Sequence, residues 1–234
     1  MRAPQAFREA RPSEILIVSR RLQAYRLVAE VLLGQGAELW IPELSLSRFY
    51  GVAERHTTRR RFLPVDDEGR IDFCPALFSK RPKMLFLEPT HAKPTGATIP
   101  ADERERLVAA ARPTNTFLFE DAYCRLLEEE APPTLASFDP GRETVIHLGA
   151  VPTWLTPLAG FSFLLAHERV IELLRASARR DYLNPEFLTQ LTASELLRSG
   201  GLHEMLVRFH AFHHERKRFV ERILTDRLGD LARL

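Results

Sequence analysis

The feature of this sequence that most constrains its fold is a regular alternation of short apolar runs with longer amphipathic stretches. Runs typical of β-strands are predicted at residues 14–19, 38–41, 62–65, 84–88, 116–120, 144–148 and 161–165. Stretches typical of helices lie between several of them, at residues 22–33, 47–54, 72–79 and 102–111. Strands that alternate with helices indicate βαβ units. The predicted fold class is therefore α/β, a three-layer sandwich with a mainly parallel sheet.

The last part of the chain has a different pattern. From residue 168 onward it is nearly all helical in spacing, with breaks near residues 184–185 and 199–201. We find no repeat, linker or low-complexity tract, so residues 1–234 are predicted to form one domain with C-terminal helices. Core or dimer packing is predicted for the apolar residues at near-helical spacing, which are Leu206, Phe209, Phe212, Phe219, Ile223 and Leu224.

Composition and charge exclude several classes of protein. The chain is 45% hydrophobic and 27% charged, which is a globular balance. Its net charge is only +2, so direct nucleic-acid binding is not expected. Cys74 and Cys124 have no metal-site or disulfide spacing, and no signal peptide is recognised, so a cytoplasmic location is expected.

One long uncharged segment, residues 148–166, has nearly the length of a membrane span. Prolines and glycines interrupt it, at Gly149, Pro152, Pro157 and Gly160. We therefore predict a strand, a loop and a second strand here, and no membrane association.

The C-terminal stretch is also rich in histidine, at His203, His210, His213 and His214. His210 and His214 are four residues apart and would share a helix face, as metal ligands often do. No third ligand completes a motif, and several arginines and a lysine surround them. A solvated helix without a metal is the preferred interpretation.

Ligands of parallel α/β sheets bind beyond the carboxyl ends of the strands, so candidate site residues are expected in the loops there. Ser19, Arg20 and Arg21 follow the first predicted strand and begin a helix. The free amides and dipole of a helix N-terminus bind anions, and arginines strengthen such a site. A solvated first turn is the alternative.

Asp121 and Tyr123 follow the strand at residues 116–120. On extended backbone, side chains two residues apart point to the same side, so a carboxylate and a phenol would lie together. Such a pair can hold a pyridinium nitrogen and a phenolate oxygen, although Asp121 is also a plausible helix cap. In the loop after residue 148, Thr153 is the one candidate nucleophile, and no base lies beside it in sequence.

The order of these loops resembles the large domain of the fold-type I pyridoxal-phosphate enzymes, the aspartate aminotransferase superfamily. More narrowly, it resembles the aminotransferase-like domain of MocR-type transcriptional regulators of the GntR family. The resemblance begins near residue 13 and rests on the order and spacing of SRRLQAY (19–25), GAELW (36–40), PVDDEG (64–69), EPTHAKPTG (88–96), FEDAYCRLL (119–127) and HLGAVPTWLTPLAGFSFLLA (147–166).

The resemblance implies roles for several residues. Asp121 would meet the ring nitrogen of the cofactor and Tyr123 its ring oxygen. Ser19 would open the turn that holds the phosphate, although Arg20 and Arg21 stand where the family has small residues.

The Pro-Thr-Gly turn of the family is present as well. Thr95 lies within this turn, and Lys93 replaces the asparagine that usually precedes the proline. The resemblance thus adds Thr95 and Lys93 to the candidate cofactor-binding residues.

Other positions depart from the family. The lysine that binds the cofactor falls on Thr153, so no internal Schiff base can form there. The phosphate-binding serine and arginine fall on Pro152 and Gly160, and the aromatic residue that stacks on the ring falls on Leu46. The family's small C-terminal domain and the regulators' winged helix-turn-helix have no recognised counterpart in this sequence.

These departures favour a degenerate aminotransferase-like domain, a non-catalytic ligand-sensing or dimerisation module related to transcriptional regulators. Pyridoxal phosphate, an amine or an amino acid would bind without a covalent bond, and a homodimer is expected. The first alternative is an active aminotransferase completed by Lys93 or by a partner chain. The second is a phosphate-binding scaffold that uses Arg20 and Arg21.

Overall fold

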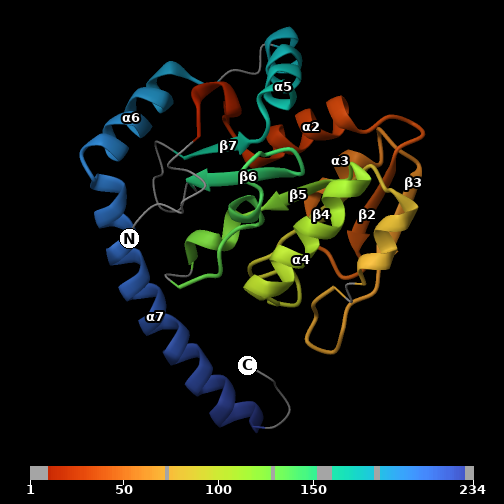
Figure 1. The fold of residues 1–234 in the computed structure, drawn as a ribbon. Helices are drawn as coiled ribbons and strands as arrows, with labels where there is room; N and C mark the ends of the chain where they lie inside the picture. The colour runs from red at the N-terminus through yellow and green to blue at the C-terminus, as the bar shows by residue number, and fades with distance from the viewer. Residues whose placement is uncertain (1–9, 72–73, 128–129, 152–159, 182–184, 230–234) are drawn as a thin grey trace.

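The fold was analysed in a computed structural model, which describes residues 10–71, 74–127, 130–151, 160–181 and 185–229. A central sheet carries helices on both faces, and a long helix extends along one side (Figure 1). This arrangement confirms the predicted α/β sandwich.

The sheet has seven strands in the order β1-β7-β6-β5-β4-β2-β3. β7 runs antiparallel to its neighbours β1 and β6, and the other neighbouring pairs are parallel. The strands are β1 (Ile15–Val18), β2 (Glu38–Pro42), β3 (Arg59–Leu63), β4 (Met84–Leu87), β5 (Phe117–Asp121), β6 (Val145–Val151) and β7 (Phe161–Leu165).

The α-helices of the described residues are α2 (Arg21–Leu32), α3 (Arg48–Ala53), α4 (Ala101–Ala111), α5 (Glu168–Arg180), α6 (Phe187–Arg198) and α7 (Gly201–Leu228). Short 3₁₀ helices are η1 (Pro12–Glu14), η2 (Pro75–Lys80), η3 (Arg112–Thr114), η4 (Tyr123–Leu127) and η5 (Leu135–Phe138). The breaks between the C-terminal helices fall where the sequence predicts them.

Two hydrophobic clusters fill the space between the sheet and the helices. Met84 and Phe86 of β4 face the cluster that contains α2, α3 and α5. Leu85 and Leu87 face the second cluster, which contains α4. Successive strand residues point to opposite faces, so a strand covered on both sides needs a continuous apolar run such as MLFL.

Some predicted boundaries were wrong. β3 occupies residues 59–63 instead of 62–65 and begins with three arginines. It is an edge strand, paired only with β2 among the described strands, so its exposed positions need no apolar side chain. A helix was predicted at residues 72–79, and the structure has a 3₁₀ helix at Pro75–Lys80.

The uncharged segment at residues 148–166 contains the end of β6 and the whole of β7, which pair antiparallel. Residues 152–159 between them lie outside the described part of the chain. No helix within the described residues is long and apolar enough to cross a membrane.

The first half of the long helix α7 packs against the rest of the chain. His210 is buried, and its Nε2 lies 2.8 Å from the main-chain carbonyl oxygen of Leu126. The prediction of a solvated histidine cluster was therefore wrong for His210, because this residue packs against η4. Across the described ranges, no group of three or more metal-binding side chains is found.

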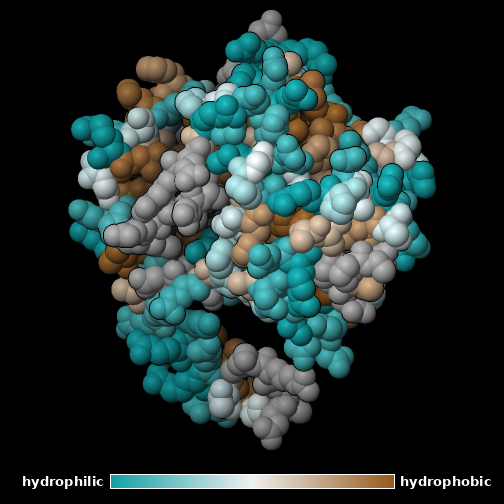
Figure 2. Space-filling model, viewed as in Figure 1, coloured by the Kyte–Doolittle hydropathy of each residue, from teal (hydrophilic) through white to brown (hydrophobic). Residues whose placement is uncertain are grey.

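Large apolar side chains remain exposed on α6 and α7, and Figure 2 shows apolar surface on the side where α6 lies. Leu206 is buried, as core packing predicts. The exposed set is Phe187, Leu188, Leu191, Leu197, Val207, Phe212, Phe219, Val220, Ile223 and Leu228.

Candidate functional site

The candidate site lies where the carboxyl ends of β4 and β5 meet the N-terminus of α2. β4 and β5 are parallel neighbours, with Leu87 opposite Glu120, so Glu88 and Asp121 leave the sheet side by side. Asp121 and Glu120 are consecutive on β5 and point to opposite faces of the sheet. Asp121 contacts α2, whereas Glu120 contacts η5 on the other face.

Asp121 is the centre of the site and is almost fully buried. Its Oδ1 accepts a hydrogen bond of 2.9 Å from the main-chain amide of Tyr123. Its Oδ2 accepts a hydrogen bond from the hydroxyl of Tyr25, and Nη1 of Arg21 lies 3.4 Å from the same oxygen. Both carboxylate oxygens are therefore bonded within the chain.

Tyr25 is a site residue that the sequence analysis missed. Its ring is buried edge-on against Phe49, Phe86 and Phe119, with ring centres 5.5, 6.0 and 5.9 Å away. Burial raises the pKa of the Tyr25 phenol, and the Asp121 carboxylate raises it further, so the phenol remains a donor. Tyr25 lies four residues after Arg21 and so on the same helix face, which is the sequence feature that could have identified it as a site residue.

Arg21 points toward the sheet rather than away from the helix N-terminus. The carbon at the centre of its guanidinium lies 4.3 Å from the centre of the Tyr123 ring, within cation–π range. Burial disfavours the charge and is the largest single effect, but Asp121, Tyr25, Glu88 and Tyr123 together outweigh it, and the pKa of Arg21 is raised. The structure thus joins three predicted site residues, Arg21, Asp121 and Tyr123, in one cluster.

Ser19 and Arg20 lie at the edge of this cluster. Arg20 is exposed and occupies the N-cap position of α2 without a side-chain cap. The amide of Ser19 donates a hydrogen bond of 2.9 Å to Oε1 of Gln23. One amide of the predicted phosphate-binding turn is therefore already bonded.

Lys93 also lies near the Tyr123 ring, with Nζ 6.0 Å from its centre. Nζ donates a hydrogen bond of 3.1 Å to Oε1 of the buried Glu88. Burial opposes the ammonium charge, but Glu88 and the thiol of Cys124 outweigh it and raise the pKa of Lys93. A lysine held as an ammonium is a poor nucleophile at neutral pH.

Glu88 was not singled out in the sequence, although it begins the EPTHAKPTG loop. Burial raises the pKa of its carboxyl and the neighbouring Asp121 raises it further, while Lys93 and Arg21 act in the opposite direction. Two acid–base pairs, Glu88–Lys93 and Asp121–Arg21, therefore lie at this edge of the sheet.

Thr95 is directed at the turn that contains Gly69. Its hydroxyl donates to the main-chain carbonyl of Gly69 at 3.1 Å and accepts from the amide of Ala97 at 3.2 Å. Gly69 has a φ of +75°, and a Cβ there would lie 2.4 Å from the Cβ of Thr95. The described contacts of Thr95 thus hold two loops together.

Of the remaining positions taken from the resemblance, Gly160 and Leu46 are described. Thr153 and Pro152 lie outside the described residues. Gly160 is described and lies just before β7. Leu46 is 70% exposed, and its amide donates a 3.0 Å hydrogen bond to the carbonyl of Lys93.

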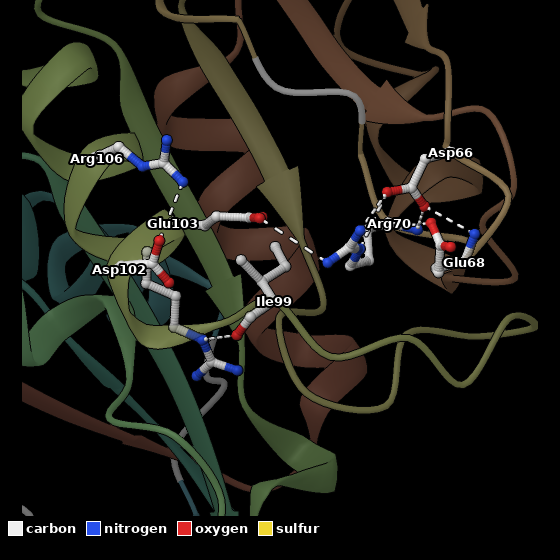
Figure 3. A network of polar contacts seen from close by, with 8 residues as sticks. Asp66, Glu68, Arg70, Ile99, Asp102, Glu103 and Arg106 are labelled. Atoms are coloured by element: carbon white, nitrogen blue, oxygen red, sulfur yellow. Dashed lines mark hydrogen bonds and ion pairs between the residues drawn. The ribbon is translucent and has the colours of Figure 1, made fainter.

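A pocket lies beside the cluster, between the end of β2 and the loops at residues 65–71 and 88–99. Most of its wall is apolar, and its polar lining residues are Ser45, Arg70, Glu88 and Lys93. Ion pairs from Arg70 to Asp66 at 2.9 Å and to Glu103 at 3.9 Å fix the Arg70 side chain (Figure 3).

A second buried polar pair, Glu120 and His147, lies on the opposite face of the sheet. Glu120 is fully buried, and its Oε2 lies 2.8 Å from Nδ1 of His147. The amides of Leu135 and Ala136 donate to the same carboxylate at 2.8 and 3.3 Å. These contacts tie η5 to β5 and β6, which is a structural role.

No known family model matches the chain. Among curated proteins, the HTH-type transcriptional regulator TauR of Rhodobacter capsulatus is 27% identical, over 92% of this chain and 44% of the relative. The 2-aminoadipate transaminase of Thermus thermophilus is 29% identical, over 88% of this chain and 53% of the relative. The chain thus spans about half the length of these relatives.

Solved structures give the same fold. The multiple substrate aminotransferase of Thermococcus profundus superposes with a TM-score of 0.82 and 20% identity, over 92% of this chain and 56% of that one. LysN, the α-aminoadipate aminotransferase of Thermus thermophilus, superposes with a TM-score of 0.79 and 27% identity, over 95% of this chain and 58% of that one. The predicted resemblance is confirmed: the chain has the fold of the fold-type I aminotransferases and is related to MocR-type regulators.

The residues of the cluster do not fit the cofactor of these enzymes as they are held here. The resemblance assigns the ring nitrogen of pyridoxal phosphate to Asp121, but both oxygens of this carboxylate are bonded within the chain. Arg21 already supplies the cation beside Asp121, and it lies over Tyr123 as well.

Proposed function

We propose that this chain is a non-catalytic, aminotransferase-like ligand-binding module. The observation that carries this proposal is the closed set of bonds around Asp121, from Tyr25, Tyr123 and Arg21. A carboxylate that is already neutralised by an arginine does not activate a pyridine ring. Position 153 is a threonine, which has no amine for an imine.

The first alternative, an active aminotransferase completed by Lys93, is less well supported. Glu88 holds Lys93 as an ammonium, and its pKa is raised instead of lowered. Imine formation requires a neutral amine. The second alternative, a phosphate scaffold, loses Arg21, which is paired with Asp121.

The pocket beside the cluster supports a specific class of ligand, a small amino acid. Glu88 can accept hydrogen bonds from an α-ammonium group, and Lys93 or Arg70 can bind an α-carboxylate. Apolar residues such as Leu44, Val65 and Ile71 would surround an aliphatic side chain. The name of one relative, a 2-aminoadipate transaminase, supports an amino acid as the ligand, although 2-aminoadipate has an acidic side chain.

We further propose that two copies associate through the exposed apolar side chains of α6 and α7. Ten large apolar residues are exposed on these two helices, including Phe212 and Phe219. A surface of this kind is typical of an interaction site. The net charge of +2 does not support DNA contacts by this chain, and the free cysteines Cys74 and Cys124 fit a cytoplasmic location.

Thermal unfolding in the presence of a panel of L-amino acids tests the proposed function. We expect an aliphatic amino acid to stabilise the wild type by about 2.7 kcal/mol at a concentration near 100 times its dissociation constant. Glu88→Gln and Lys93→Met should each weaken this stabilisation, whereas Glu105→Gln, which alters an exposed carboxylate on α4, should not. Stabilisation by no amino acid, or equal stabilisation of all variants, would contradict the proposed ligand.

A further inference from the structure

The side chain of Arg21 has an arrangement that differs from an ordinary first-turn arginine. Most arginines at a helix start extend into solvent, but the Arg21 side chain is only 27% exposed. It leaves α2 in the direction of the sheet, so that its guanidinium contacts groups at the end of β5.

Arg21 contacts both of the residues that the resemblance assigns to the cofactor ring. Nη1 lies 3.4 Å from Oδ2 of Asp121, and the guanidinium carbon lies 4.3 Å from the centre of the Tyr123 ring. A guanidinium is planar and cationic, as a pyridinium ring is, and it both pairs with carboxylates and stacks on aromatic faces.

The need for a cation at this point follows from the burial of Asp121. Its side chain has no exposed surface, and an isolated buried carboxylate is strongly unfavourable. Tyr25 and the amide of Tyr123 donate hydrogen bonds but carry no charge. Arg21 is the cation that the structure places within ion-pair distance of Asp121 in the described part of the chain.

We propose that Arg21 is an internal replacement for the cofactor ring, and that it closes the Asp121–Tyr123 site to pyridine compounds. The helix start before it, Ser19 and Arg20, then has no phosphate to bind. This inference goes beyond the proposed ligand pocket, which is lined by other residues.

The inference predicts that removing the guanidinium opens a site. Arg21→Ala would leave a buried carboxylate beside an aromatic ring, with the space of a planar cation between them. Small planar cations should bind in this space, because a soluble analogue of the missing guanidinium can occupy its place and pair with Asp121.

The test combines thermal unfolding with calorimetric titration of the full chain. The probes are methylguanidinium chloride and pyridoxine 5′-phosphate, which has the cofactor's ring and phosphate but no aldehyde to react with surface lysines. The variants are Arg21→Ala, Arg21→Lys and the matched control Arg20→Ala, which removes the exposed neighbouring arginine.

We expect no titration heat for wild type with pyridoxine 5′-phosphate. Arg21→Ala should lower the Tm by roughly 5 °C or more, because the buried carboxylate loses its counter-ion. Methylguanidinium should restore most of that loss, and pyridoxine 5′-phosphate should now bind. Arg20→Ala should behave as wild type, and Arg21→Lys should lie between wild type and Arg21→Ala.

Two results would overturn the inference. One is saturable binding of pyridoxine 5′-phosphate to wild type that Asp121→Asn abolishes. The other is an Arg21→Ala variant that matches Arg20→Ala in Tm and gains nothing from methylguanidinium. If Arg21→Ala does not fold, the inference is still tested by the titration of wild type with pyridoxine 5′-phosphate and by the Tm of Arg21→Lys. The amino-acid titration is a separate experiment, so failure of the ligand pocket is distinguishable from failure of this inference.

Discussion

Arg104, buried in α4, donates a hydrogen bond of 2.6 Å from Nη2 to the main-chain carbonyl of Pro89. Its Nε donates to the carbonyl of Ile99 at 2.7 Å, and Nη1 donates to that of Pro133 at 2.9 Å. Burial lowers the pKa of Arg104 to about 10, so the guanidinium remains charged at neutral pH. One side chain therefore fixes both ends of the loop that carries Glu88 and Lys93.

Substitution of Arg104 should be strongly destabilising. Arg104→Met keeps an unbranched side chain but leaves several buried carbonyls without a donor, so we expect the free energy of unfolding to fall by about 3 kcal/mol. Urea denaturation measures the change. Arg106→Met, two residues along the same helix, removes an exposed ion pair to Asp102 and should change stability by less than about 0.5 kcal/mol. Equal effects of the two variants would contradict the anchoring role.

The phenol of Tyr25 should contribute to stability through Asp121. Tyr25→Phe keeps the ring and its aromatic contacts but removes the buried hydrogen bond, so we expect a loss of about 1–3 kcal/mol. The matched control is Tyr50→Phe, because the hydroxyl of Tyr50 bonds to Arg60 at the surface. Urea denaturation of both variants at neutral pH makes the comparison, and no loss in Tyr25→Phe would show that Asp121 does not need this donor.

The Glu120–His147 pair predicts how stability depends on pH. Burial alone would raise the pKa of the Glu120 carboxyl, but His147 and the η5 amide bonds outweigh it and the pKa is lowered from its ordinary value of 4.5. A carboxyl whose pKa is lower in the folded state than in the unfolded state stabilises the fold at pH values above its unfolded-state pKa. This stabilisation is lost as the pH falls below about 4.5 through the folded value.

Glu120→Gln should therefore lower the free energy of unfolding at pH 7. It should also make this free energy fall less steeply as the pH becomes acidic. Denaturation across the acidic range, beginning near neutrality, measures both effects. Glu105→Gln, in an exposed position, should reproduce the wild-type curve. A Glu120→Gln curve parallel to that of the wild type would show that Glu120 is not the group responsible.

Self-association should depend on the apolar face of α7. Replacing Phe212 and Phe219 together with glutamate should shift the molar mass measured by light scattering from dimer toward monomer, because charged groups would be buried in the interface. Arg208→Glu, exposed on the same helix, changes the charge without removing apolar surface and should leave the mass unchanged. A monomeric wild type would contradict the proposed assembly.

The sequence predicted the layers of the fold well because buried strands and amphipathic helices have distinct patterns. The run MLFL of β4 is apolar throughout since both faces of the sheet are covered. The pattern failed at β3, where three arginines begin an edge strand. Local pattern carries no information about which strand lies at the edge.

The candidate site was predictable only in part. The spacing of Asp121 and Tyr123 and the resemblance pointed to the edge of the sheet where the Asp121 cluster lies. The partner of Asp121 is Tyr25, which lies 96 positions earlier in the chain, and sequence spacing cannot show such a contact. His210 was misread for the same reason, because its partner Leu126 lies 84 positions away.

The most direct test of the central claim is a search for covalent chemistry in the wild-type chain. The protein is incubated with pyridoxal phosphate and an amino donor, reduced with borohydride and mapped by mass spectrometry. We predict no turnover above background, and no more adduct on Lys93 than on the exposed Lys217. Turnover that Lys93→Ala abolishes, together with a dominant adduct on Lys93, would show that the chain is an active enzyme.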